Sequence, residues 1–242
     1  MATKNQAGIE IDGKRKKIII LGTGDIGQLA HFYFTHDSPY EVVAFTADKK
    51  FIDKKKFLGL PLIPFEKIKK SYPPDKFNMF VALSYRGLNK VRAEKYAEAK
   101  RKGYRLVSYI STKSVYWGDT KIGDNCFIFE NQTIQPFVKI GNNVTIWSGN
   151  HIGHSSVIGD HCFITSHVVI SGHVTVGSYS FLGVNSTIRD GITLARESVI
   201  GAGAIIVKDT VEKGVYICKA AELYSRDSSK TKYFVKTGYS QK

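Results

Sequence analysis

The chain is poor in cysteine, proline and tryptophan, and it has no long apolar stretch. Its three cysteines, Cys126, Cys162 and Cys218, are an odd number without a CxxC pair, so neither a disulfide framework nor a zinc site is indicated. We expect them to be buried small residues. The longest apolar run, around residues 17–21, is too short to span a bilayer, and residues 1–7 lack the apolar region of a signal peptide. We therefore expect a cytoplasmic protein with no membrane insertion.

Acidic residues are also few, since 21 Asp and Glu stand against 35 Lys and Arg, for a net charge of +14. The basic residues concentrate in residues 14–17, 49–56 and 67–70. Such clusters suit anionic ligands such as nucleotides. No helix-turn-helix, RNA-recognition or zinc-finger pattern accompanies them, so we do not expect a nucleic-acid partner. A length of 242 residues with 43% hydrophobic content favours two domains.

An internal repeat dominates the second half of the chain. An aliphatic residue occupies every sixth position at fifteen consecutive sites: Ile122, Ile128, Ile134, Ile140, Ile146, Ile152, Ile158, Ile164, Ile170, Val176, Leu182, Ile188, Leu194, Ile200 and Ile206. Glycine often follows this residue, which suggests a corner, and small or β-branched side chains predominate four positions after it. Gln132 and Asn150 interrupt the small-residue positions.

A period of six predicts short strands that turn a corner every six residues, with three strands in each coil. Each aliphatic side chain then stacks on its counterpart eighteen residues earlier, in the interior of a parallel β-helix. An antiparallel sandwich is excluded, because its strands alternate with period two between turns spaced eight to twelve residues apart.

The first half of the chain alternates strand and helix patterns. We predict strands at residues 17–21, 41–46, 78–83 and 104–110, and helices at residues 28–35 and 87–102, which together indicate a parallel sheet. A glycine turn, Gly22-Thr-Gly-Asp-Ile-Gly27, lies where the first strand meets the first helix, which is the context in which glycine turns hold phosphates. Asp48 follows the second strand at the spacing of a dinucleotide fingerprint. Two alternatives stay open: an NAD or NADP site, for which the region is short, and glycines that only shape a tight turn.

The repeat resembles that of the hexapeptide-repeat acyltransferases over roughly residues 112–211. Together with the glycine-turn region, it resembles the sialic acid O-acetyltransferase family, which includes bacillosamine-pathway and perosamine N-acetyltransferases. The resemblance implies an α/β N-terminal Rossmann-like domain followed by a left-handed parallel β-helix, and a homotrimer. The boundaries expected on this basis are a nucleotide-sugar-binding domain at 14–111, an acyltransferase domain at 112–218 and a tail at 219–242. In the nucleotide-sugar site, the matching residues are Gly22, Gly24, Asp25, Gly27 and Asp48.

The same resemblance suggests where the chemistry occurs. His154-Ser-Ser-Val-Ile-Gly159 aligns with a family segment His-acidic-x-Val-Ile-Gly, which makes His154 the general base and leaves Ser155 in place of the acidic neighbour. Gly172 aligns with the residue whose backbone amide meets the acetyl carbonyl of acetyl-CoA. Eighteen residues separate Gly172 from His154, so the repeat independently places it one coil higher, about 5 Å away.

Further residues follow from the same alignment. Acetyl-CoA, the expected co-substrate, is expected to contact Gly201, Ala202, Gly203 and Lys208, while His151 and Ser155 are candidates for the acceptor pocket. His161, His167 and His173 lie in three successive hexapeptides, on different faces, so we expect no metal site.

The function expected from this resemblance is N-acetylation of a nucleotide-linked 4-amino-4,6-dideoxy sugar in bacterial surface glycan biosynthesis. We expect direct attack on the thioester in a ternary complex, because no cysteine lies beside a base. Two alternatives remain: O-acetylation of a sugar or sialic acid hydroxyl, and a non-catalytic β-helix that only binds a partner.

Overall fold

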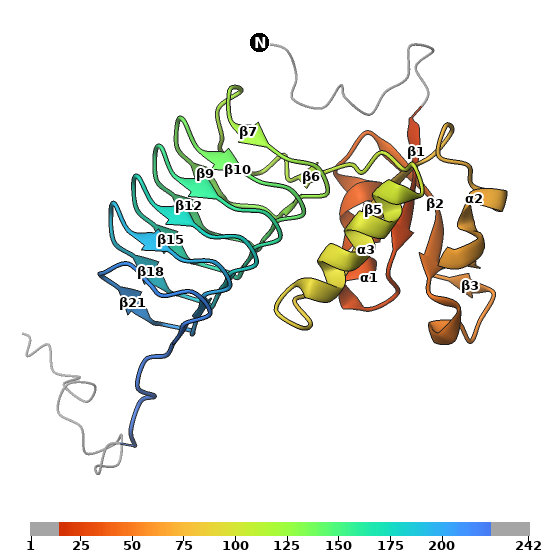
Figure 1. The fold of residues 1–242 in the computed structure, drawn as a ribbon. Coiled ribbons are helices and arrows are strands. Elements are labelled where there is room, and N and C mark those ends of the chain that lie inside the picture. The colour runs from red at the N-terminus through yellow and green to blue at the C-terminus, as the bar shows by residue number, and fades with distance from the viewer. Residues whose placement is uncertain (1–14, 224–242) are drawn as a thin grey trace, which may run out of the picture.

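The computed structural model describes residues 15–223, which form an α/β part and a β-helix lying to one side of it (Figure 1). The predicted fold class, an α/β region followed by a left-handed parallel β-helix, is confirmed. Of the expected tail, residues 224–242 lie outside the described residues. Within residues 15–223, no helix combines the length and the apolar character needed to cross a bilayer.

The N-terminal part is a five-stranded sheet in the order β3-β4-β2-β1-β5 with helices packed against it. The strands are β1 (Lys16–Leu21), β2 (Tyr40–Ala47), β3 (Lys56–Phe57), β4 (Leu60–Pro64) and β5 (Asn78–Val81). The helices are α1 (Asp25–His36), α2 (Ile68–Ser71) and α3 (Lys90–Arg101), with two 3₁₀ turns at Lys49–Phe51 and Phe65–Lys67. The sheet is parallel except for the β3–β4 hairpin.

The N-terminal part differs from the sequence prediction in two places. Strand β4 is absent from the prediction, because Pro61 and Pro64 in its short sequence are typical of turns and sheet edges. The strand predicted at 104–110 is wrong for most of its length. Leu106 makes only an isolated bridge to Met79, and the short strand β6 (Tyr109–Ile110) pairs with the β-helix instead of the N-terminal sheet.

The β-helix has three faces, which we call I, II and III in the order the chain visits them. Face I contains β6 (Tyr109–Ile110), β8 (Phe127–Ile128), β11 (Thr145–Ile146), β14 (Phe163–Ile164), β17 (Phe181–Leu182), β20 (Val199–Ile200) and β22 (Val215–Tyr216). Face II contains β9 (Thr133–Ile134), β12 (His151–Ile152), β15 (Val169–Ile170), β18 (Thr187–Ile188) and β21 (Ile205–Ile206). Face III contains β7 (Lys121–Ile122), β10 (Lys139–Ile140), β13 (Val157–Ile158), β16 (Thr175–Val176) and β19 (Thr193–Leu194).

The aliphatic period builds the core of the β-helix, as predicted. From β6 to β21, partners in neighbouring strands are eighteen residues apart, as in Ile140 with Ile158, and the aliphatic residue of nearly every strand is buried. Each such side chain contributes roughly 1.5–3 kcal/mol through burial. Cys126 and Cys162 lie in the same interior, where burial raises the pKa of each thiol to about 12, so neither is a nucleophile at neutral pH. The prediction was wrong for Cys218, which is exposed.

The corners are built differently from the sequence prediction. The left-handed conformation falls not on the glycine after each aliphatic residue but two positions later, for example on Asn143, Ser155 and His173. The glycines are required by close packing of coils instead: a Cβ on Gly153 would lie 2.4 Å from the carbonyl carbon of Ser171. At such a corner, the Cβ of any residue other than glycine would clash with the backbone of the next coil.

Specific polar contacts fix the N-terminal part against face I. The side-chain amide of Asn125 pairs with both backbone groups of Val81, at 2.7 and 3.1 Å, and so continues the edge of β5. Asp124 accepts hydrogen bonds from Tyr96 and Lys100 of α3. These contacts place the end of β5 beside face I.

Asp37, which follows α1, is a third tether, and it makes stability depend on pH. Its carboxylate accepts hydrogen bonds from the Tyr109 hydroxyl at 2.6 Å and from the backbone and side chain of Thr112. Burial alone would raise the pKa of Asp37, but these hydrogen bonds hold it below its usual value. A carboxyl whose pKa is lower in the folded state stabilises above its unfolded pKa of about 3.9, and that stability is lost as the pH falls through the folded value.

We expect Asp37→Asn to lower the urea midpoint at pH 7, and this gap from wild type to narrow as the pH falls below about 4, through the lowered pKa of Asp37. Urea unfolding at a series of pH values measures this gap. Asp75→Asn, a change in the turn after α2, is the control and should show little effect. A gap for Asp37→Asn that stays constant with pH would contradict the assignment.

Candidate functional site

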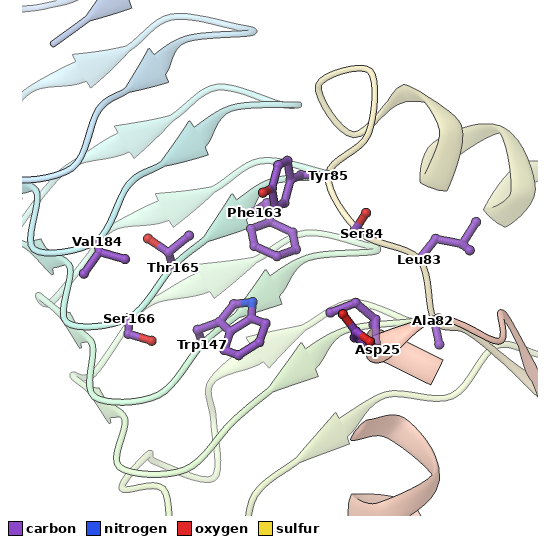
Figure 2. A pocket seen from close by; sticks show the side chains of 12 residues that line it. Asp25, Ala82, Leu83, Ser84, Tyr85, Trp147, Phe163, Thr165, Ser166 and Val184 are labelled. Atoms are coloured by element: carbon purple, nitrogen blue, oxygen red, sulfur yellow. The ribbon is translucent and has the colours of Figure 1, made fainter. Parts of the chain in front are cut away.

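A cleft of about 660 Å³ lies between the N-terminal part and the β-helix (Figure 2). One wall is the glycine turn at residues 24–26, and a second is the segment at residues 82–85 after β5. The β-helix supplies the opposite wall from face I and from the corner between faces I and II, with Trp147, Phe163, Thr165, Ser166 and Val184. The cleft therefore depends on both parts of the chain.

The glycine turn has the geometry that leaves backbone open to a ligand. Gly22 has a φ of +128°, and a Cβ there would lie 2.3 Å from the carbonyl oxygen of Ala82. Gly27 is equally constrained, because a Cβ there would lie 2.3 Å from the carbonyl oxygen of Gly22. Nothing lies within 4 Å of a Cβ built on Gly24, which borders the cleft. Gly22 and Gly27 thus shape the turn and the packing of α1, and Gly24 faces open space at the N-terminus of that helix.

A second cavity, of about 370 Å³, lies at the carboxyl ends of β1 and β2 and shares Gly24, Leu83 and Ser84 with the cleft. Asp48 borders it and accepts a hydrogen bond from Lys95 at 2.5 Å. Burial alone would lower the pKa of Lys95, but the hydrogen bonds to Asp48 and Glu98 raise it, so the amine stays charged. Asp48 therefore borders the predicted nucleotide site as half of an ion pair.

The β-helix wall of the cleft contains two aromatic side chains, Trp147 and Phe163. Trp147 stacks on Phe129 with ring centroids 4.8 Å apart and planes within 7°, and Tyr85 packs edge-on against Phe163 at 5.0 Å. The carbonyl of Trp147 accepts a hydrogen bond from buried Gln132, one of the residues that interrupt the small-residue positions. Among the described residues, nothing accepts the buried indole N–H of Trp147. The two rings give this wall a flat apolar area beside the hydroxyl-bearing Thr165 and Ser166, and that area suits a ring face or a methyl group.

His154 lies at a different place, the corner between faces II and III. Its side chain is exposed, its backbone N–H donates to Gln135 at 2.8 Å, and its ring meets His173 edge-on at 4.8 Å. Gly172 lies above it, one coil higher, and a Cβ on Gly172 would be 2.7 Å from His154 Nε2. The backbone N–H of Gly172 donates to no acceptor within the described part of the chain. A basic nitrogen and a free amide thus lie next to each other.

The remaining residues predicted for the site divide between two corners. Lys208 lies at the II–III corner above His154, and Ser155 follows His154 with a left-handed backbone. Gly201, Ala202 and Gly203 lie at the I–II corner, and the half-buried His151 is on β12 of face II.

Within one chain these groups do not all meet. His154 does not line the cleft, which is bordered by face I and the I–II corner. The structure therefore brings His154 and Gly172 together but keeps them apart from the predicted nucleotide site.

The three successive histidines do not converge either. His161 lies at the III–I corner, His167 at the I–II corner and His173 at the II–III corner. Within residues 15–223, no three His, Cys, Asp or Glu side chains gather as a metal-binding group.

Comparison with protein-family models identifies the six-residue period as a hexapeptide repeat. Residues 119–154 and 137–172 match the model described as bacterial transferase hexapeptide (six repeats), and residues 173–208 match the hexapeptide repeat of succinyl-transferase. The matched segments lie entirely within the β-helix.

Comparison with solved structures extends the likeness to both parts. The acetyltransferase domain of PglB from Neisseria gonorrhoeae superposes with a TM-score of 0.74 at 22% identity, covering 83% of this chain and 96% of that one. PerB from Caulobacter crescentus, solved with CoA and GDP-perosamine, gives a TM-score of 0.73 at 22% identity, covering 82% and 92%. WeeI from Acinetobacter baumannii gives 0.51 at 17% identity, covering 78% and 94%. The chain thus carries the hexapeptide repeat of bacterial transferases on the two-part fold that these structures share.

Proposed function

We propose that this protein transfers an acetyl group from acetyl-CoA to the amino group of a nucleotide-linked 4-amino-4,6-dideoxy sugar. The observation that carries the proposal is the pairing of His154 with the free N–H of Gly172. Acyl transfer from a thioester needs a base near neutral pH and a donor for the developing oxyanion, and the pair supplies both. The PglB acetyltransferase domain has been solved with acetyl coenzyme A, which supports the same co-substrate here.

In the proposed reaction, the amine nitrogen of the sugar attacks the acetyl carbonyl. The imidazole of His154 takes a proton from that amine as the new bond forms. The N–H of Gly172 donates to the carbonyl oxygen as negative charge develops on it. The C–S bond then breaks, and the CoA thiolate leaves and takes up the proton that His154 holds. Buried Cys126 and Cys162 take no part, so we propose direct transfer.

The two connected cavities support a nucleotide sugar as acceptor. The smaller cavity holds the nucleotide, with Gly24 and the N-terminus of α1 at the phosphates and Asp48 at its edge. The sugar extends into the cleft, where a methyl group packs on Trp147 and Phe163. Asp25 is the only charged side chain among the described residues that line the cleft, and it favours an amino sugar over a neutral one. PerB, solved with GDP-perosamine, supports this class of acceptor.

A homotrimer joins the separate halves of the site. Face I packs against the N-terminal part, but faces II and III lie open, and the outward side chains of face II include Val169 and Ile205, which are 39% and 69% exposed. On face III the first two strands present Lys121 and Lys139 outward, and Val157 is 38% exposed, so face II is the more apolar of the two. If three copies bury face II around one axis, the II–III corner of each copy meets the I–II corner of its neighbour.

This arrangement brings His154 and Lys208 of one copy to the cleft and the Gly201–Gly203 turn of the next. We propose that acetyl-CoA lies in the groove between the two copies, with Lys208 at its phosphates. A cytoplasmic location fits the supply of acetyl-CoA and nucleotide sugars, and the product would enter bacterial surface glycans.

The proposal is tested by thiol release from acetyl-CoA with UDP-, GDP- and dTDP-linked 4-amino sugars and their 4-hydroxy counterparts. We expect turnover with amino sugars of one nucleotide class and little with the hydroxy forms. Turnover with hydroxy sugars alone would replace N-acetylation by O-acetylation. Acetyl-CoA that fails both to react and to raise the melting temperature would favour a non-catalytic β-helix, because a ligand of the folded state must stabilise it.

A further inference from the structure

The II–III corner carries a column of residues that the repeat stacks above one another. Each member comes two positions after the aliphatic residue of a face II strand: Pro136, His154, Gly172, Asp190 and Lys208. Neighbouring members are one coil apart, so His154 and Asp190 are separated by two coils, about 10 Å along the axis. Only Gly172 lies between them.

The missing side chain of Gly172 lets the two neighbours approach each other. A Cβ built on Gly172 would lie 2.7 Å from His154 Nε2 and 2.8 Å from Asp190 Oδ1. The imidazole and the carboxylate thus reach toward the same point from below and above, and their separation cannot exceed the sum of those two distances. A carboxylate within that range can stabilise positive charge that forms on the imidazole during transfer.

We propose that Asp190 is the positioning carboxylate of His154, stabilising the imidazolium that forms when the base takes the proton of the acceptor. The inference rests on the proposed function and deepens it. It identifies the group that replaces the acidic neighbour of the base. The resembling enzymes carry that acidic residue at the position where this chain has the hydroxyl of Ser155. Asp190 exchanges no proton in this role, and it acts by lowering the energy of the charged intermediate.

The other carboxylates at or near the corners of the β-helix have hydrogen-bond partners of their own. Asp160 accepts hydrogen bonds from Asn142 at the III–I corner, and Glu130 accepts hydrogen bonds from Tyr33 and Ser148 at the I–II corner. Asp209, near the column, accepts from the backbone N–H of Thr193.

The charged groups around the pair are few. His173 meets the ring of His154 edge-on, Arg189 precedes Asp190 in the chain, and Lys208 occupies the next coil of the column. Neither Arg189 nor Lys208 forms an ion pair with Asp190 within the described residues, so its carboxylate is available to the imidazolium.

Asp190→Asn tests the assignment, with initial rates measured over a range of acetyl-CoA and acceptor concentrations. We expect kcat to fall about 10- to 100-fold while the KM for acetyl-CoA changes less than about threefold, because the lost interaction arises only during transfer. The melting temperature should match wild type, since Asp190 is exposed. Asp75→Asn removes the same charge from the N-terminal part and should leave kcat unchanged.

The decisive variant moves the carboxylate back beside the base. Ser155 has a φ of +60°, a conformation that aspartate tolerates, so Ser155→Asp can be added to Asp190→Asn. We expect the double variant to recover kcat to within about threefold of wild type. An unchanged kcat in Asp190→Asn overturns the inference, and so does a loss that Ser155→Asp fails to restore. Both results leave the proposed function standing, whereas a wild-type protein that acetylates no acceptor in the panel overturns the proposed function and this inference with it.

Discussion

Replacing His154 with alanine is expected to lower kcat for acetyl transfer about 10²- to 10⁴-fold, the usual contribution of a general base. The side chain is exposed at a corner, and its backbone N–H keeps its hydrogen bond to Gln135, so the fold should tolerate the change. The free amide of Gly172 remains in the variant and should sustain the residual rate. Thiol release with the best acceptor of the panel measures the effect.

Binding and reaction must be separated for this result to identify a base. Acetyl-CoA should raise the melting temperature of His154→Ala and of wild type by similar amounts, because the proposed CoA contacts lie elsewhere along the groove. His173→Ala is the matched control, since its ring contacts His154 at the same corner. If His173→Ala loses more activity than His154→Ala, the base is assigned to the wrong histidine.

The fold could be predicted because its information is local and repeated. Fifteen aliphatic residues at one spacing fix strand length, corner position and the eighteen-residue register together. The register pairs from β6 to β21 agree with them, whereas β20 and β22, beyond the end of the repeat, pair sixteen residues apart. The N-terminal sheet lacks such redundancy. Pro61 and Pro64 obscured β4, and the apolar residues before β6 are buried without forming a regular strand.

The site could be predicted only where it follows the period. The spacing that stacks Gly172 on His154 also stacks Asp190 on Gly172. The sequence alone could therefore have predicted that Asp190 lies near the base. Aromatic residues also recur on face I, at Phe163 and Phe181, eighteen positions apart. Phe163 lines the cleft because the end of β5 docks beside it, and no periodicity in the sequence encodes that docking.

Docking of the N-terminal part depends on a buried cation, Arg92 of α3. The side chain is 1% exposed, and its Nη2 donates to the carbonyl oxygens of Asn143, His161 and Cys162 at 2.9–3.2 Å. Strand pairing satisfies the carbonyl of Cys162 but not those of Asn143 and His161, which lie at corners. Burial lowers the pKa of Arg92 to about 10, so the guanidinium stays charged at neutral pH and the helix caps the corner carbonyls with a full positive charge.

Arg92→Ala is therefore expected to destabilise the folded chain by about 3 kcal/mol, because two corner carbonyls lose their donor and a cavity opens beside Phe163. Urea unfolding followed by tryptophan fluorescence measures the change, since Trp147 lies close to the docking surface. Arg101→Ala, at the exposed end of the same helix, should cost no more than about 0.5 kcal/mol. Arg92→Met fills the space without donating, so it should recover only the cavity part of the loss. Full recovery by methionine would show that α3 is held by packing alone, and that the corner carbonyls do not need the guanidinium.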